Sequence, residues 1–261
     1  MDQINSPVLQ KHLNEHILLV TLNRPAARNA INGALTAALG QIVEDTESNP
    51  DIWAVILTGS GDKAFSAGAD LREVADGRVA QLSTPRGGFA GFANFQRSKT
   101  WIAAVNGPAL AGGMEIALAC DMIIAADTSI FGLPEVKRGL MATEGGLYRL
   151  PRVIPRAIAL EMIATGNPIS AARALSLGLV NDVVPADKLI ESAYRLASGI
   201  CENSPLAVRE SLRIARHAQA WPEERLHREG HEALAKLAKT EDYQEGPSAF
   251  LEKRTPKWTG R

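Results

Sequence analysis

Short apolar runs alternate along this chain with segments of helical periodicity, and this alternation restricts the fold more than any other feature. Residues 16–22 ("HILLVTL"), 52–58 ("IWAVILT"), 102–106 and 122–125 have the apolar content of β-strands. Residues 33–47 place leucine, isoleucine and valine at the spacing of one helix face. Strands that alternate with helices predict an α/β architecture.

The second half of the chain is richer in helical patterns. From about residue 155 onward the pattern is mostly helical, apart from a short apolar piece at 179–184. Helices are expected at 187–201, 205–217 and 223–237. We therefore expect two regions, an α/β core over residues 1–200 and a helical region over residues 201–261. A glycine-rich segment at 83–95 is expected to form a mobile loop that leads into a helix.

Composition excludes several classes of partner. The 261 residues are 46% hydrophobic and 22% charged, which is enough apolar material for a sizeable core. A net charge of −1 argues against nucleic-acid binding and against attraction to an acidic membrane surface. No apolar run approaches the ~18 residues of a membrane span, and no secretory signal is evident. The two cysteines, Cys120 and Cys201, cannot form a disulfide framework, so a soluble cytoplasmic protein is expected.

Three patterns imitate functional motifs without their usual context. "GSGDKA" at 59–64 matches a nucleotide-binding pattern, but no helix is expected to open at that loop. Ser66 lacks the glycine two positions earlier that a nucleophile elbow requires. His227 and His231 have zinc-ligand spacing, but Arg228 occupies the glutamate position of that motif, which favours a solvated helix face and no metal site.

Three other segments combine small residues with isolated carboxylates. Residues 65–71 ("FSAGADL") and 107–121 ("GPALAGGMEIALACD") each follow a predicted strand. Glycine and alanine let a ligand approach backbone N–H groups closely, so two such loops can aim two donors at one oxygen. Glu115 interrupts the apolar part of the second segment, and Glu135 follows a proline in a third, "FGLPEVKRG" at 131–139. A carboxylate in an apolar run is rarely buried without a partner or a function.

Together these segments resemble the enoyl-CoA hydratase/isomerase (crotonase) family. The resemblance extends from "LNRPAARNA" near residue 22 to "EGPSAFLEKR" near residue 254, in the same order and spacing. It implies a spiral of ββα turns followed by a C-terminal helical trimerisation region. It also implies an acyl-CoA thioester substrate, of which coenzyme A is a part, with no separate cofactor and no metal. The expected assembly is a homotrimer or a dimer of trimers.

The resemblance assigns roles to particular residues. The backbone N–H groups of Ala67 and Gly112 would hold the thioester oxyanion, as in an oxyanion hole. Glu115 would activate water for attack on Cβ, and Glu135 would donate the proton to Cα. The implied reaction is the reversible addition of water to a 2-enoyl-CoA, giving a 3-hydroxyacyl-CoA through a stabilised thioester enolate.

Substrate contacts are implied at both ends of the chain. Arg24 and Arg28 are candidates for contact with the coenzyme A phosphates. Phe250 and Lys253 match positions that reach the adenine and phosphate region, often from a neighbouring subunit. The remaining substrate-binding residues implied by the family motif are Ala67, Gly68, Ala69, Asp70 and Gly112.

One departure from the family pattern leaves several possibilities open. Where the family usually has Pro-Gly-x-Gly-Gly, this chain has "ATEGG" at 142–146, which adds a third carboxylate, Glu144. Glu144 would favour the start of the next helix, add polarity to the acyl pocket, or perturb Glu135. "FAGF" at 89–92 and the C-terminal segment also look like the carnitinyl-CoA dehydratase branch, which acts on a polar acyl chain. The family resemblance is also compatible with a double-bond isomerase that does not need Glu115 or with a non-catalytic acyl-CoA-binding scaffold, whereas the net charge of −1 argues against an RNA-binding member.

Overall fold

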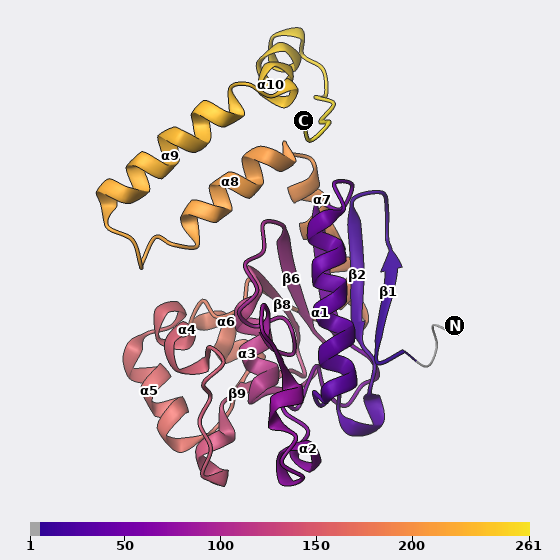
Figure 1. The fold of residues 1–261 in the computed structure, drawn as a ribbon, viewed down its shortest axis with the longest axis vertical. Helices are drawn as coiled ribbons and strands as arrows, with labels where there is room; N and C mark the ends of the chain where they lie inside the picture. The colour runs from indigo at the N-terminus through magenta and orange to yellow at the C-terminus, as the bar shows by residue number, and fades with distance from the viewer. Residues whose placement is uncertain (1–5) are drawn as a thin grey trace.

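The computed structural model describes residues 6–261, and its main element is a six-stranded sheet (Figure 1). Residues 1–5, which belong to the N-terminal segment that is expected to lack a secretory signal, lie outside the described range. The strand order is β1-β2-β3-β6-β8-β11, with β1 antiparallel to β2 and every other pair parallel. The strands are β1 (Val8–His12), β2 (Ile17–Leu22), β3 (Ala54–Gly59), β6 (Thr100–Val105), β8 (Met122–Ala126) and β11 (Asp182–Val184).

Side chains on successive strand positions enter two different clusters, because they point to opposite faces of the sheet. On one face, Ile56 of β3 and Ile102 of β6 pack with Ala193 of α7. On the other face, Leu57 and Trp101 join the larger cluster beneath α1 and α3. Every residue of β3 and β6 is buried, which explains their continuous apolar sequences.

Ten helices surround or extend this sheet within residues 6–261. Their bounds are α1 (Gly33–Ser48), α2 (Leu71–Ala75), α3 (Gly112–Ala119), α4 (Gly146–Val153), α5 (Arg156–Thr165), α6 (Ala171–Ser176), α7 (Leu189–Cys201), α8 (Pro205–Ala215), α9 (Glu223–Leu237) and α10 (Glu241–Glu252). A small sheet of β10 (Ile169–Ser170), β9 (Ile130–Gly132) and β7 (Ala109–Leu110) lies beside the main one. No helix in this part of the chain has the length and apolar content to cross a membrane.

The predicted strands at 16–22, 52–58, 102–106 and 122–125 correspond to β2, β3, β6 and β8. The helices expected at 33–47, 187–201, 205–217 and 223–237 correspond to α1, α7, α8 and α9. The apolar piece at 179–184 contains β11. Strand β1 and helix α10 were not predicted from the sequence, the first because three of its five residues are exposed and polar.

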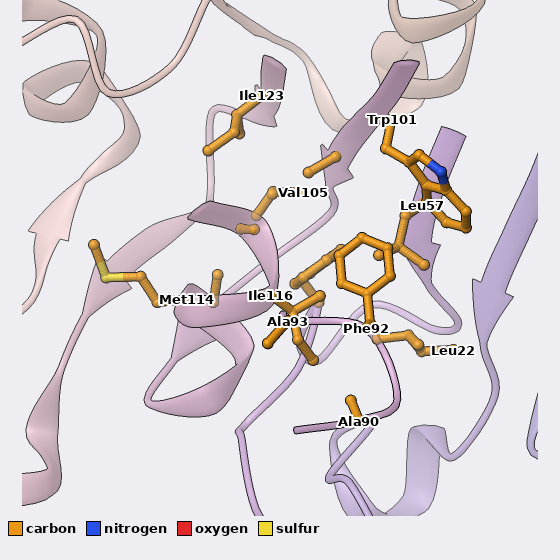
Figure 2. Close-up of a cluster of buried hydrophobic side chains, with 14 of the residues drawn as sticks. Leu22, Leu57, Ala90, Phe92, Ala93, Trp101, Val105, Met114, Ile116 and Ile123 are labelled. Carbon is orange, nitrogen blue, oxygen red and sulfur yellow. The ribbon is translucent and has the colours of Figure 1, made fainter. Parts of the chain in front are cut away.

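The segment 83–95 does not lead into a helix. It forms a short hairpin, β4 (Ser83–Thr84) and β5 (Gly88–Phe89), followed by turns that run into β6. Phe89, Phe92 and Phe95 are all buried, which fixes this segment to the core. Figure 2 shows Phe92 beside Trp101, and their ring centroids lie 4.9 Å apart in an edge-on arrangement.

The C-terminal helices extend away from the sheet. Figure 1 shows α8, α9 and α10 beyond the end of α7, with α10 farthest from α2 and α3. Arg216, just after α8, ties this region to the core through Asp121, whose Oδ1 lies 2.7 Å from its Nε. Helix α7, which ends at Cys201, packs on the sheet. The division of the chain near residue 200 into an α/β core and a helical region stays a prediction.

Candidate active site

Two neighbouring parallel strands deliver two loops to the same edge of the sheet. β3 pairs with β6, so the chain that leaves each carboxyl end emerges side by side. The first loop carries residues 66–70, and the second leads through β7 into α3. A bridge between Ser66 and Ala109 joins the two loops, and the Leu110 N–H donates to the Ser66 carbonyl oxygen at 3.1 Å. The fold therefore places the two small-residue segments in direct contact.

Glycines make this contact possible. A Cβ atom on Gly113 would lie 2.1 Å from the Ser66 carbonyl oxygen. A Cβ atom on Gly68, whose φ is +85°, would lie 2.7 Å from the Gly112 nitrogen. Neither position tolerates a side chain without moving backbone, so the small residues bring the two loops into van der Waals contact.

The orientation of the backbone N–H groups differs from the sequence-based expectation for Ala67. The Ala67 N–H donates to the Arg28 carbonyl oxygen at 3.0 Å, which argues against the free oxyanion donor predicted there. The positive φ of Gly68 then turns the chain, and Ala69 forms a parallel bridge with Ile31. That bridge uses the Gly68 carbonyl and the Asp70 N–H, so the Ala69 N–H points away from Ile31.

The N–H groups of Ala69 and Gly112 donate to no other group among residues 6–261. Gly112 is the first residue of α3, where N–H groups have no partner within the helix. Ala111, the residue before it, has φ 52° and ψ −129°, a conformation that costs an L-residue about 1–3 kcal/mol. This strained residue directs the chain so that α3 begins at the loop contact. Both free donors line one cavity of about 820 Å³.

Glu115 is buried in the first turn of α3 and lines the same cavity. Its side chain is only 3% exposed, and its Oε1 accepts the Gly146 N–H at 2.9 Å. Burial raises the pKa of Glu115 to about 7, and the negative charges of Glu135 and Glu144 add to that shift. The N–H groups of Gly146 and Glu144 oppose it by stabilising the ionised form. A carboxylate with this pKa can accept and release a proton near neutral pH.

Glu135 also lines the cavity, from the 3-10 helix Pro134–Arg138. Pro134 begins this turn and Gly139, in a left-handed conformation, ends it. Burial raises the pKa of Glu135, and the nearby charge of Arg138 lowers it. Its Oε2 is buried and has no hydrogen-bond partner among the residues that the structure describes. This oxygen is therefore available for a hydrogen bond to a bound molecule or to water.

The third carboxylate, Glu144, also lines the cavity, but it does not cap the next helix through its side chain. Its Oε2 accepts bonds from the Phe89 N–H at 3.4 Å and from the Asn94 side chain at 3.3 Å. Its charge raises the pKa of Glu115, whereas the predicted effect on Glu135 is not observed. Glu144 therefore connects the segment 83–95 to the wall of the site.

The predicted coenzyme A contacts divide into two groups. Arg24 and Arg28 line the cavity. Arg24 is held by Asp70, with its Nη2 3.0 Å from Oδ2, whereas Arg28 is exposed and forms no ion pair within the described range. Phe250, 82% exposed, and Lys253 belong to the α10 region, which Figure 1 shows far from α2 and α3, two helices that line the cavity. Sequence reasoning missed the cavity-lining Arg72 and Arg138, which no motif distinguished from ordinary surface charges.

The motifs that imitate other functions have structural explanations. Strand β3 ends at Gly59 and the next helix begins only at Leu71, so no helix opens at the "GSGDKA" loop. The buried Ser66 hydroxyl donates to the Asn29 carbonyl oxygen at 2.8 Å. His227 and His231 lie on α9 with their Nε2 atoms 3.1 Å apart. Across residues 6–261, no group of three or more histidine, cysteine or acidic side chains is placed to hold a metal.

Two carboxylates with raised pKa values beside two free backbone N–H groups define a class of enzyme, one that transfers protons next to a stabilised oxyanion. The sequence profile described as "Enoyl-CoA hydratase/isomerase" matches residues 12–261. The chain therefore belongs to the enoyl-CoA hydratase/isomerase (crotonase) family. The predicted family, the α/β crotonase fold and the assignment as a hydro-lyase of that family are confirmed.

Individual relatives agree with this assignment over almost the whole chain. A carnitinyl-CoA dehydratase of Salmonella typhi is 42% identical over 253 residues, which cover 95% of this chain and 97% of the relative. The structure of an enoyl-CoA hydratase from Mycobacterium tuberculosis is 41% identical, with a TM-score of 0.93 over 98% of this chain and 100% of that one. A carnitinyl-CoA hydratase from Mycobacterium avium is 44% identical, with a TM-score of 0.78 over 98% and 100% of the two chains.

Proposed function

We propose that the protein is an enoyl-CoA hydratase that adds water reversibly to a 2-enoyl-CoA and yields a 3-hydroxyacyl-CoA. The observation that carries the proposal is that Glu115 and Glu135 line one cavity together with the two free backbone donors. Hydration requires a base for the water and an acid for Cα, both next to the thioester oxygen. The cavity of about 820 Å³ lies within the size range of small-molecule sites.

The N–H groups of Ala69 and Gly112 bind the thioester oxygen and stabilise the enolate as its charge develops. The assignment of Ala69 replaces that of Ala67, whose N–H is already used by Arg28. Loss of one such donor typically raises the barrier by about 3 kcal/mol.

Glu115 accepts a proton from water as the oxygen attacks Cβ, and Glu135 delivers a proton to Cα. The Gly146 N–H fixes the Glu115 carboxylate during this step. Burial of Glu135 favours its protonated form, which is the form that an acid requires. In dehydration the two residues exchange these roles, because the reverse reaction passes through the same transition state.

Coenzyme A is proposed to lie along the cavity rim, where Arg28 is available for a phosphate. Phe250 and Lys253 contribute only when a second copy of the chain supplies them, because α10 lies far from the cavity-lining helices α2 and α3 of its own chain (Figure 1). This arrangement fits the proposed homotrimer or dimer of trimers. Phe250→Ala and Lys253→Ala should then raise KM for the CoA ester in the assembled enzyme.

A carnitinyl-CoA dehydratase-like enzyme is the second candidate. The relatives that are 42% identical over 95% of this chain carry that name. The same two glutamates would perform the dehydration, so the two candidates differ in acyl group rather than in mechanism.

The test is a spectrophotometric assay of crotonyl-CoA hydration by wild type, Glu115→Gln and Glu135→Gln. Each substitution should lower kcat by at least about 100-fold, the typical contribution of a general acid or base. Binding of the CoA ester should change little. Full hydration activity of Glu115→Gln would refute the two-glutamate mechanism, and tight binding of enoyl-CoA without turnover by wild type would favour a scaffold.

A further inference from the structure

A fully buried asparagine, Asn29, closes the turn that begins at Arg24. Its Oδ1 accepts the Arg24 N–H at 2.9 Å and the Ser60 hydroxyl at 3.3 Å. Its Nδ2 donates to the carbonyl oxygens of Ser60 at 3.0 Å and of Ala64 at 2.8 Å. Both donors and both acceptor positions of the amide are therefore used. The side chain fixes the turn to the chain that leaves β3.

The backbone of this turn in turn holds the loop that carries one of the proposed oxyanion donors. The buried Ser66 hydroxyl donates to the Asn29 carbonyl oxygen at 2.8 Å. The Ala67 N–H donates to the Arg28 carbonyl oxygen at 3.0 Å. Two successive residues of the loop are thus bound to two successive residues of the turn.

A third bond determines the direction of the donor itself. The Ile31 N–H donates to the Gly68 carbonyl oxygen at 2.8 Å. That carbonyl and the Ala69 N–H belong to the same peptide group, and in a trans peptide the two point in opposite directions. Because the carbonyl is fixed toward Ile31, the Ala69 N–H is directed away from the turn.

The conformation of the turn explains why an asparagine occupies this position. Arg28 and Asn29 are both left-handed, with φ of 54° and 53°. Asparagine adopts this region more readily than most residues. Arg28 and Ala30 line the cavity, whereas Asn29 between them is 0% exposed and lies outside the lining. Asn29 can therefore affect the reaction only through the backbone that it holds.

We propose that Asn29 is a positioning residue for the Ala69 oxyanion donor. Its side chain keeps the turn closed, and the closed turn fixes the peptide group that carries the donor. This inference rests on the proposed function and adds to it a residue outside the cavity.

The test measures how strongly the site polarises a bound thioester carbonyl. Butyryl-CoA labelled with carbon-13 at this carbonyl has the chain length of crotonyl-CoA but no double bond to hydrate. Hydrogen bonds to the oxygen lower the stretching frequency of the carbonyl. Isotope-edited infrared spectra at saturating butyryl-CoA therefore report the geometry of the donors and not the affinity. The kcat for crotonyl-CoA and the melting temperature are measured on the same samples.

Two variants remove the hydrogen bonds of the Asn29 side chain in different ways. Asn29→Gly accepts the left-handed φ without strain but has no side chain. Asn29→Asp is nearly isosteric, but an oxygen replaces Nδ2, so it loses both donations and places two carbonyl oxygens against a carboxylate.

Asn14 provides a matched control, because its side chain also closes a turn. Its Oδ1 accepts the N–H groups of His16 at 2.9 Å and of Ile17 at 2.8 Å. This turn lies at the amino end of β2, whereas the site lies at the carboxyl ends of β3 and β6. Asn14→Gly should lower the melting temperature and leave the carbonyl frequency and kcat unchanged.

Wild type should lower the carbonyl frequency of butyryl-CoA relative to that of the free ester in buffer. Each Asn29 variant should lose about half of this displacement, because one of two donors is misdirected. Its kcat should fall by about tenfold to a hundredfold. A role in stability alone would lower the melting temperature without changing the carbonyl frequency at saturation.

A folded Asn29 variant that keeps the carbonyl frequency of wild type would overturn this inference, whatever its kcat, and would leave the proposed function intact. A wild type that hydrates crotonyl-CoA without lowering the carbonyl frequency would also overturn it, and this measurement requires no variant. A wild type that does not hydrate crotonyl-CoA would overturn the proposed function and the inference with it.

Discussion

The approach of Gly68 to Gly112 provides a sharp test of the proposed oxyanion site. In Gly68→Ala the new methyl group would lie 2.7 Å from the Gly112 nitrogen, and an ordinary contact begins at 3.4 Å. The two loops must therefore separate by about 0.7 Å. A displacement of about 1 Å at a reacting centre can cost about a hundredfold in rate. We expect kcat for crotonyl-CoA to fall about a hundredfold, equivalent to about 3 kcal/mol of transition-state stabilisation.

The same substitution also strains the backbone, so it needs a control with equal strain and no contact. Gly178 provides one, because its φ of +76° is close to the +85° of Gly68 and a Cβ atom there would meet nothing within 4 Å. Gly178→Ala should lose about 1–2 kcal/mol of unfolding free energy in urea denaturation, and Gly68→Ala should lose more because of its close contacts. Only Gly68→Ala should lose activity in the spectrophotometric assay. A folded Gly68→Ala variant with the kcat of wild type would refute the proposed role of the two loops.

Three further predictions concern charges. Because the folded protein holds the Glu115 proton up to about pH 7 rather than 4.5, the stability from this group is present below about 4.5 and is lost as the pH rises through about 7. Glu115→Gln should therefore raise the unfolding free energy by up to about 3 kcal/mol above pH 7 and little below 4.5, in urea denaturation. The kcat/KM of wild type should fall as the pH drops through about 7, because Glu115 becomes protonated. Glu144→Gln should move this fall in the pH profile to lower pH, because it removes a charge that raises the pKa of Glu115. A pH profile that does not move would contradict this coupling. Arg28→Ala should raise KM about tenfold for crotonyl-CoA but not for crotonyl-pantetheine, and an equal effect on both would exclude a phosphate contact.

The central strands and the two glutamates could be predicted from the sequence for physical reasons. Strands β3 and β6 are buried on both faces, so they appear as continuous apolar runs between turn residues. Glu115 is conspicuous because a carboxylate interrupts the apolar segment that becomes α3. The convergence of Glu115 and Glu135 followed only from the resemblance to a family, since periodicity contains no information about distant contacts.

The backbone geometry of the site was beyond sequence reasoning. Gly68 could be identified as a flexible position, but not the direction in which its positive φ turns the next N–H. The engagement of Ala67 by Arg28 and the strained conformation of Ala111 left no pattern in the residue types. The donation by the Gly146 N–H to Glu115 is likewise a contact between segments 31 residues apart.

The position of Phe89 has a consequence for how this enzyme could diversify. Its ring lies against the Gly112 backbone, while its N–H donates to Glu144 on the acyl wall. Mutations in the segment 83–95 that reshape the acyl wall would therefore also shift an atom of the oxyanion site. New substrate preferences that arise in this segment should therefore come with altered turnover.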